Sequence, residues 1–189
     1  MAEIRTIAVI GAGSRGCDLA HICARGGFRT ILEDLLPASL RRAEGEIRAA
    51  FDLSVATGEL SRAAADAALG RIEYASSVEQ AAREADLVIE AVPDELESKL
   101  EILTLLDKVA RPATILALSS GGFSVSDLAS VTYRADKVLG MRLWVSAEGT
   151  ELLEIVRSRK TAAEIAAACA DAGHKMGVRV MVTDEVPAG

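Results

Sequence analysis

The sequence has few aromatic side chains and no long uninterrupted apolar run. Aromatic residues make up 3% of its 189 residues, although apolar residues make up 50%, so a core has to be built mainly from Ala, Val, Ile and Leu. This composition favours helices packed against a buried parallel sheet over a β-sandwich. No apolar run reaches the roughly 18 residues of a membrane span, and no signal peptide precedes the first predicted strand. We therefore expect a soluble, cytoplasmic protein.

Positive charge and cysteine are also scarce. The net charge of −7 at pH 7 disfavours nucleic acid and anionic membranes as partners, because both attract basic surfaces. Cys17, Cys23 and Cys169 are an odd number of cysteines without the spacing of metal ligands, so we predict reduced structural thiols and no metal site. Arginine outnumbers lysine beside abundant alanine, which is typical of a GC-rich bacterial genome.

Strand and helix patterns alternate along the chain. Short apolar runs predict strands, and helical periodicity predicts the helices between them. The predicted strands cover residues 4–10, 28–32, 71–75, 85–92, 113–118, 138–143, 152–156 and 178–182. The predicted helices cover residues 14–25, 95–109 and 161–172, and residues 37–69 form two antiparallel helices with a break near Thr57-Gly58.

Helical crossovers between strands predict a mostly parallel sheet with right-handed connections. The pattern contains no repeat, low-complexity segment or linker. We therefore predict a single domain over residues 1–189. Its expected fold is α/β of the Rossmann type, a doubly wound sheet with helices on both faces and a protruding helical hairpin.

The first predicted strand ends in a glycine-rich loop, Gly11-Ala12-Gly13-Ser14-Arg15-Gly16, which opens the first helix. Gly11 permits the tight turn, Gly13 lets the backbone approach a pyrophosphate, and Gly16 lets helix and strand pack closely. The free amides and the positive end of the helix dipole would then face the phosphates. This context predicts dinucleotide binding. Arg15 either leans over the pyrophosphate or is solvated on the helix surface.

An acidic pair ends the second predicted strand. Asp34 lies 18 residues after Gly16, where a carboxylate accepts hydrogen bonds from the adenosine ribose and repels the 2′-phosphate of NADP. The predicted cofactor is therefore NAD. Glu33 is adjacent, but side chains alternate along a strand, so we expect only one of the two acids to face the cofactor.

The whole chain resembles the NAD-binding domain of the L-3-hydroxyacyl-CoA dehydrogenases. The match is carried by IAVIGAGSRG at residues 7–16 and ADLVIEAVPDELESK at residues 85–99, and it continues through GELS, VLGMR and ELLEIV. The resemblance implies that Ala91, Asp94 and Lys99 contact the nicotinamide ribose region, with Asp94 in place of a family Glu. The alternative for Lys99 is an exposed helix lysine.

The catalytic residues of the family match less well. In the family a histidine base is held by a glutamate twelve residues later, with a serine and an asparagine nearby. The glutamate matches Glu154, whereas the histidine position is Arg142, the asparagine position is Val145 and the serine position falls in residues 119–122, on Gly121. Arginine does not release its proton near neutrality, whereas histidine titrates at about 6.5. We expect a structural Arg142–Glu154 ion pair and weak or no classical dehydrogenase activity.

The substrate side also departs from the family. Family members usually carry lysines near the turn of the helical hairpin, where they meet the phosphates of CoA, but this turn carries Glu59. The chain ends at Gly189, where the family's all-helical substrate and dimerisation domain would begin. A truncated chain and a natural single-domain protein remain open, as do a homo-oligomer and a partner helical domain.

Three functions remain open on these residues. The favoured one is a non-catalytic NAD(H)-binding protein. The second is a divergent or partner-completed oxidoreductase acting on a 3-hydroxyacyl-CoA or a related 3-hydroxy acid. The third binds no dinucleotide, because Arg15 or Trp144 blocks the site. Trp144 itself either lines the vacated cleft or fills the space left by the family's Asn and Pro, which we favour.

Overall fold

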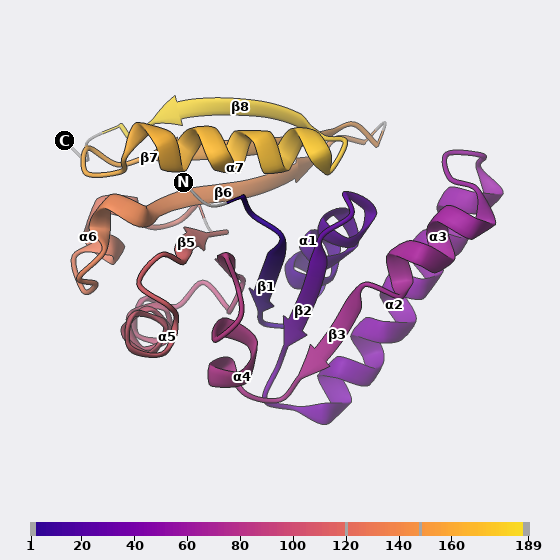
Figure 1. Cartoon of the computed structure of the whole chain (residues 1–189), viewed down its shortest axis with the longest axis horizontal. Coiled ribbons are helices and arrows are strands. Elements are labelled where there is room, and N and C mark those ends of the chain that lie inside the picture. Colours follow the sequence, from indigo (N-terminus) through magenta and orange to yellow (C-terminus); the bar gives the residue numbers. More distant parts are fainter. Residues whose placement is uncertain (1–2, 120, 148, 187–189) are drawn as a thin grey trace.

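An eight-stranded sheet forms the middle layer of the protein (Figure 1). The structure, a computed structural model, describes residues 3–119, 121–147 and 149–186. The strand order is β3-β2-β1-β4-β5-β6-β7-β8, and β6 and β7 form the antiparallel pair in an otherwise parallel arrangement. The strands are β1 (Thr6–Ile10), β2 (Arg29–Glu33), β3 (Ile72–Ala75), β4 (Leu87–Glu90), β5 (Ile115–Leu118), β6 (Val138–Val145), β7 (Glu151–Arg157) and β8 (Arg179–Asp184).

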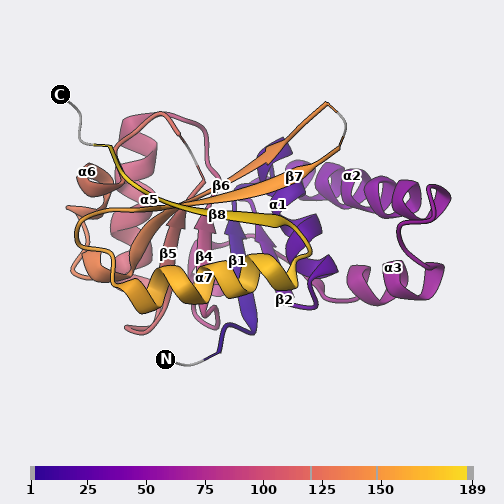
Figure 2. The same cartoon turned by 90° about the horizontal axis from the view of Figure 1, so that it is seen from above.

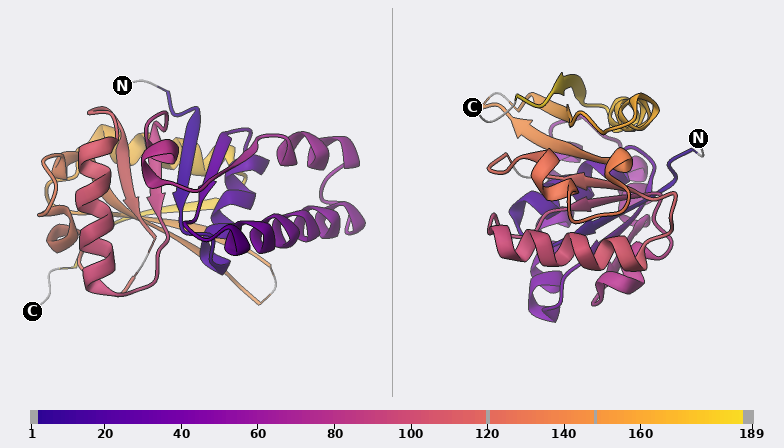
Figure 3. Two further views of the ribbon diagram at one scale, coloured as in Figure 1. Left: turned by 90° about the horizontal axis from the view of Figure 1, so that it is seen from below. Right: turned by 90° about the vertical axis from the view of Figure 1, so that its left-hand side faces the viewer.

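Helices cover both faces of this sheet, which confirms the predicted doubly wound α/β fold. One face carries α1 (Ser14–Arg25), α2 (Pro37–Ala56), α3 (Arg62–Leu69) and α7 (Ala163–Lys175). The other carries α4 (Val78–Ala82), α5 (Leu96–Val109) and α6 (Val125–Ala129), and a short 3₁₀ helix spans Ala135–Lys137. Figure 3 shows α5 and α7 on opposite sides of the strands. No helix in the described ranges is long and apolar enough to cross a membrane.

The helices α2 and α3 form the predicted hairpin, which projects beyond the strands in Figure 2. The hairpin packs on α1 through small and apolar side chains, including Phe51, which is fully buried. Thr57 caps α2, and Gly58 follows with a φ of +79°. This left-handed conformation suits glycine and turns the chain back toward α3. The predicted break at Thr57-Gly58 is therefore confirmed.

The central strands are buried on both faces, as parallel strands between two helical layers must be. Alternate residues of β1 serve the two halves of the core: Ile7 and Val9 contact the α1 side, whereas Ala8 and Ile10 contact the α4–α6 side. These four residues are at most 1% exposed. The continuous apolar runs of the sequence therefore mark central strands rather than edge strands.

Two short helices escape the sequence prediction. Each of α4 and α6 has five residues, which is too short for helical periodicity to emerge. Their capping motifs are nevertheless present: the side chain of Ser77 accepts a hydrogen bond from the backbone of Gln80, and that of Ser124 accepts one from Asp127. A serine three residues before a polar or acidic residue is a helix-start motif that would have indicated both helices.

The last helix is longer than predicted, because Gly173 does not end it. The prediction of 161–172 stops short of the observed Ala163–Lys175. A Cβ at Gly173 would lie 2.7 Å from the side chain of Val180 and 2.9 Å from that of Leu153. The glycine therefore lets α7 lie close to β7 and β8, and its role is packing rather than termination.

The start of α1 lies unusually close to the backbone of β1. A Cβ at Gly16 would lie 1.9 Å from the carbonyl oxygen of Gly11. Gly11 has a φ of +105°, and a Cβ there would lie 2.8 Å from the carbonyl oxygen of Ala91. Both positions therefore require glycine. Gly13 differs, since a Cβ there would meet nothing within 4 Å.

We predict that Gly16→Ala destabilises the fold because its methyl group would collide with the backbone of Gly11. Overpacking of this kind costs about 3 kcal/mol, so thermal melting should fall by roughly 6 to 12 °C for a chain of this size. Gly13→Ala is the matched control and should cost about 1 kcal/mol or less. Equal melting temperatures for the two variants would contradict the close approach.

Candidate functional site

A cavity of about 660 Å³ lies at the carboxyl ends of β1, β2 and β4. The order β2-β1-β4 means that the connections diverge between β1 and β4, and ligands of doubly wound sheets bind at such a switch point. Most of the residues predicted for the cofactor line this cavity: Gly11, Gly13, Ser14, Arg15, Asp34, Ala91 and Asp94. Ala12, Gly16 and Lys99 do not line it and are buried.

The amino-terminal end of α1 faces this cavity. Gly13 is its N-cap residue, and the first turn carries no acidic side chain. The first amides of a helix have no partner within the helix and carry the positive end of its dipole. Because the space around the missing side chain of Gly13 is open, a phosphate has room to approach these amides. This end of α1 therefore fits the pyrophosphate of a dinucleotide.

Asp34 is held beside the glycine-rich loop by backbone amides. Its Oδ2 accepts a hydrogen bond from the amide of Ala12 at 3.1 Å, and its Oδ1 accepts one from the amide of Leu36 at 2.9 Å. The carboxylate is thus fixed where a ribose bound next to the phosphate loop presents its hydroxyl groups. The geometry fits the ribose-binding acid that the sequence predicts.

Glu33 lines the same cavity, so the expectation that only one of the two acids faces it is wrong. Side chains alternate within an extended strand, but β2 ends at Glu33. Asp34 belongs to the following turn, where alternation no longer applies. Two consecutive acids can therefore face one cavity.

The carboxyl group of Glu33 is in an unusual environment. The residue is 2% exposed, and its Oε1 has no hydrogen-bond partner among the described residues. Burial raises the pKa of Glu33 to about 7, with further contributions from the negative charges of Asp34 and Glu79. A buried carboxyl group without a partner is costly, so the cavity holds one polar group that awaits a donor.

An ion-pair chain connects the glycine-rich loop with β4 and α5. Arg15 lies 3.1 Å from Asp94, and both side chains are 41% exposed. The ammonium group of Lys99 lies 3.2 Å from Asp94 and 2.9 Å from each carboxylate oxygen of Glu90. Partial burial would raise the pKa of Asp94, but hydrogen bonds from Arg15 and Lys99 lower it.

Lys99 is fully buried, so the alternative of an exposed helix lysine is wrong. Glu90, its main partner, is 1% exposed. The carboxylate stabilises the buried ammonium group, and the two together attach α5 to the end of β4. The pairing also explains why Lys99 does not reach the cavity surface: its charge is already neutralised beneath Asp94.

A second group of the predicted residues lies on β6 and β7. Arg142 and Glu154 occupy directly opposite positions of the antiparallel pair, and their charged atoms are 3.6 Å apart. The predicted ion pair is confirmed. Glu154 also accepts hydrogen bonds from the Nε1 of Trp144 at 3.2 Å and from the hydroxyl of Thr183 at 3.4 Å.

Gly121 lies beside the guanidinium group of Arg142: a Cβ on this glycine would be 3.6 Å from the Nε. Ser120 lies outside the described residues. Trp144 is 54% exposed and Val145 is 56% exposed. The expectation that Trp144 fills an internal space is therefore wrong, since its ring remains largely accessible while its nitrogen binds Glu154.

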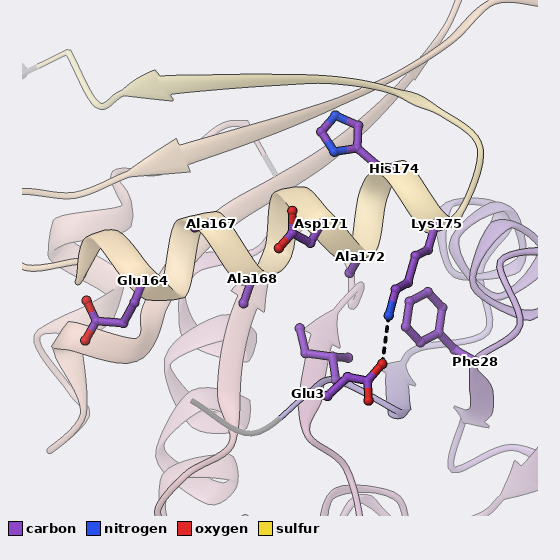
Figure 4. Close-up of a pocket in the computed structure, with 10 residues that line it drawn as sticks. Glu3, Phe28, Glu164, Ala167, Ala168, Asp171, Ala172, His174 and Lys175 are labelled. Carbon is purple, nitrogen blue, oxygen red and sulfur yellow. Dashed lines mark hydrogen bonds and ion pairs between the residues drawn. The ribbon is translucent and has the colours of Figure 1, made fainter.

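A further cavity of about 560 Å³ lies between α7 and the segment before β1 (Figure 4). Alanine side chains of α7 and the ring of Phe28 line it, and Lys175 pairs with Glu3 across it at 2.9 Å. None of the residues predicted for cofactor or catalysis is among its lining residues. The cavity next to the glycine-rich loop is therefore the candidate site.

The three cysteines take no part in either cavity. Cys17, Cys23 and Cys169 are buried and unpaired, and burial raises the pKa of the Cys17 thiol to about 12. No cluster of possible metal ligands occurs among residues 3–119, 121–147 and 149–186. The three thiols lie in the core, as structural cysteines would.

We predict a pH-dependent stabilisation by Glu33→Gln. Because folding raises the pKa of Glu33 from 4.5 to about 7, the folded state favours the protonated form. The favourable contribution of wild-type Glu33 is present below about pH 4.5 and is lost as the pH rises through 7. Relative to wild type, Glu33→Gln should therefore gain up to about 3 kcal/mol between pH 4.5 and 8 in urea unfolding.

The exposed acid Glu79 provides the control for this experiment. Glu79→Gln removes a neighbouring negative charge but leaves the buried carboxyl group of Glu33 in place. The unfolding free energy of this variant should therefore stay close to that of wild type at every pH. A difference between wild type and Glu33→Gln that does not change with pH would show that the carboxyl group is not desolvated.

Comparison with known proteins identifies the family of this chain. The model of the 3-hydroxyacyl-CoA dehydrogenase NAD-binding domain matches residues 6–186. The chain is 28% identical over 185 residues to a probable 3-hydroxybutyryl-CoA dehydrogenase of Bacillus subtilis, a match that covers 98% of this chain and 64% of the relative. It is 29% identical over 185 residues to 5-formyl-3-hydroxy-2-methylpyridine 4-carboxylate 5-dehydrogenase of Mesorhizobium japonicum, with 97% and 59% covered.

A solved structure of a dehydrogenase has the same fold over this chain. The crystal structure of 3-hydroxybutyryl-CoA dehydrogenase from Escherichia coli K12 matches with a TM-score of 0.92 at 28% identity, over 98% of this chain and 39% of that one. The chain thus spans less than two-thirds of the length of each of these proteins. Since the family model covers nearly the whole chain, the chain belongs to the NAD-binding domain family of the 3-hydroxyacyl-CoA dehydrogenases, whose cofactor is NAD.

Proposed function

We propose that this chain binds NAD(H) in the 660 Å³ cavity and has weak or no classical dehydrogenase activity by itself. The observation that carries the proposal is the ion pair of Arg142 with Glu154. It occupies the positions at which the resemblance expects a histidine base and the carboxylate that holds it. A guanidinium group keeps its proton at neutral pH, so it does not take the proton of an alcohol.

The cavity residues have distinct parts in the proposed cofactor site. The amides at the start of α1, contributed by Gly13, Ser14 and Arg15, bind the pyrophosphate. Asp34 accepts hydrogen bonds from the adenosine ribose. Ala91 and Asp94 contact the nicotinamide ribose region. When bound, NAD(H) supplies the ability to accept or deliver a hydride.

The buried members of the predicted set act indirectly. Gly11 and Gly16 allow the close backbone approach that shapes the loop, and the amide of Ala12 holds Asp34. Lys99 positions Asp94 from below. The exposed Arg15–Asp94 pair is worth little free energy, so Arg15 is free to exchange Asp94 for a phosphate. This disfavours the alternative in which Arg15 blocks the cavity.

The residues at the remaining positions of the family's catalytic group also favour weak or no dehydrogenase activity. Glu154 is retained, but its carboxylate is already engaged by Arg142, Trp144 and Thr183. Gly121 and Val145 carry no group that polarises a carbonyl or holds a water molecule. The described side chains at the family's catalytic positions therefore include no histidine that could take the proton of an alcohol near neutrality.

The second candidate function is a divergent or partner-completed oxidoreductase acting on a 3-hydroxyacyl-CoA or a related 3-hydroxy acid. The relatives are dehydrogenases by name, which favours it. The exposed Glu59 at the hairpin turn is unfavourable for the phosphates of CoA. One relative is named for a pyridine carboxylate rather than a CoA ester, so a free hydroxy acid is the substrate class that suits this turn better.

A partner helical domain would complete either function. Four large apolar side chains of β6 and β8 are 41–56% exposed: Trp144, Val145, Met181 and Val182. β6 and β8 lie on either side of β7 in the sheet, and large apolar side chains left exposed on them indicate a contact surface. We propose that a helical domain, in the same polypeptide, in a partner or in a second copy of this chain, covers them. On this proposal residues 1–189 are one NAD-binding domain.

We predict that the chain binds NADH more tightly than NADPH and that Asp34 sets the preference. Titration should enhance NADH fluorescence with saturation below millimolar concentration. Asp34→Ser should weaken NADH binding by about 10-fold and NADPH binding less, because the ribose loses a carboxylate acceptor while the 2′-phosphate loses a repulsive charge. Asp18→Ser on the outer side of α1 is the control. No binding at millimolar NADH would overturn the cofactor site.

A second prediction concerns activity. Reduction of acetoacetyl-CoA by the natural chain should be at least about 100-fold slower than an ordinary dehydrogenase turnover of about 10 s⁻¹. Arg142→His should raise the rate, because an imidazole opposite Glu154 restores a titrating group. Arg179→His, on exposed β8 of the same sheet, should not. An ordinary turnover number for the natural chain would contradict our account of Arg142.

A further inference from the structure

Several of the residues that line the candidate cavity are apolar. Beyond Asp34 its walls come from β2, the start of α4 and the segments after β4, with Val78, Val92 and Ile102 among its lining residues. In a doubly wound sheet the half that contains β1 to β3 holds the adenosine part of the dinucleotide. Apolar side chains here suit the faces of a planar base.

Glu33 introduces a carboxyl group among these apolar side chains. Glu33 is only 2% exposed and lines the cavity. Its Oε1 has no hydrogen-bond partner in the described chain. Buried polar atoms are nearly always satisfied in folded proteins. Because no described side chain supplies the missing donor, a ligand in the cavity is the natural source.

The chemistry of adenine matches this need. Its edge presents an exocyclic amino group as donor and ring nitrogens as acceptors. Both the ionised and the protonated carboxyl group keep an oxygen that accepts a hydrogen bond. We propose that Glu33 determines base specificity by accepting a hydrogen bond from the exocyclic amino group of adenine. The inference rests on the proposed cofactor site and adds to it a residue that reads the base.

Glu33 and Asp34 would thus have separate parts in recognising one nucleoside. The carboxylate of Asp34 is already oriented by the amides of Ala12 and Leu36 and lies next to the phosphate loop, as a ribose acceptor must. No described amide donates a hydrogen bond to the Oε1 of Glu33. Glu33 is the last residue of β2, and it lines the cavity where we place the base. Hypoxanthine carries a carbonyl oxygen in place of the amino group, so at a pH well above 7, where Glu33 is ionised, the two groups are both acceptors.

The test compares NADH with the reduced nicotinamide hypoxanthine dinucleotide, measured by titration calorimetry on the whole chain. Wild type should prefer NADH by about 10- to 100-fold. Glu33→Leu should reduce this preference to within about threefold, since no acceptor remains. Glu33→Gln, whose amide can accept from adenine or donate to the carbonyl of hypoxanthine, should keep NADH binding while its preference falls below that of wild type.

Glu79→Gln is the matched control, since it removes a nearby exposed acid and should leave the wild-type preference unchanged. The preference of wild type is itself decisive if Glu33→Leu does not fold. Equal binding of both dinucleotides by wild type, or an unchanged preference in Glu33→Leu, would overturn this inference and leave the cofactor site intact. Failure of wild type to bind either dinucleotide at millimolar concentration would overturn both.

Discussion

The close backbone approach between α1 and the ends of β1 and β4 is the constraint on which the cavity depends. Gly16 comes so near the carbonyl of Gly11, and Gly11 so near that of Ala91, that neither position has room for a side chain. These contacts bring the first turn of α1 over the switch point of the sheet. Its amides then face the cavity rather than solvent at the edge of the molecule, and a phosphate can approach them.

The same geometry determines how charge is distributed around the cavity. Arg15 and Lys99 both reach Asp94, one from α1 and one from α5, so this acid connects the two helices across the end of β4. Asp34 is satisfied by backbone amides. Glu33 has neither compensation, and burial therefore raises its pKa to about 7. Three acids around one cavity thus differ in their availability to a ligand, and Glu33 retains the largest unmet hydrogen-bonding capacity.

The sequence predicts what depends on local order. The glycine-rich loop, the acid at the end of β2 and the hairpin turn at Thr57-Gly58 could be placed because each needs a fixed residue at a fixed distance from a strand or helix. The burial of Lys99 could not, because its partner Glu90 lies on a strand and meets it only when α5 packs on β4. The continuation of α7 through Gly173 could not be predicted for a similar reason: only the packing of α7 on β7 and β8 shows that this glycine is a contact residue.

The part of Glu33 was hidden by a rule that is valid only inside a strand. Alternation assigns consecutive residues to opposite faces, so once Asp34 is placed by its distance from Gly16, the rule puts Glu33 on the other face. β2 ends at Glu33, so the turn that follows carries Asp34 back to the same cavity. An acid directly after two apolar residues was the available indication, since Ile31 and Leu32 just before it are buried in the core.

The family's catalytic positions show that geometry and chemistry are separable in this fold. The register of β6 and β7 places residues 142 and 154 opposite each other. This register depends on backbone pairing and on the apolar residues of the two strands, so it does not require a particular side chain at position 142. On the proposed function, an arginine therefore occupies the histidine position without moving the strands, and it pairs with Glu154. The cofactor cavity depends on a different set of contacts, around Gly11 and Gly16. The loss of the base that we propose would leave those contacts untouched, so the proposed NAD binding does not depend on proton transfer by this chain.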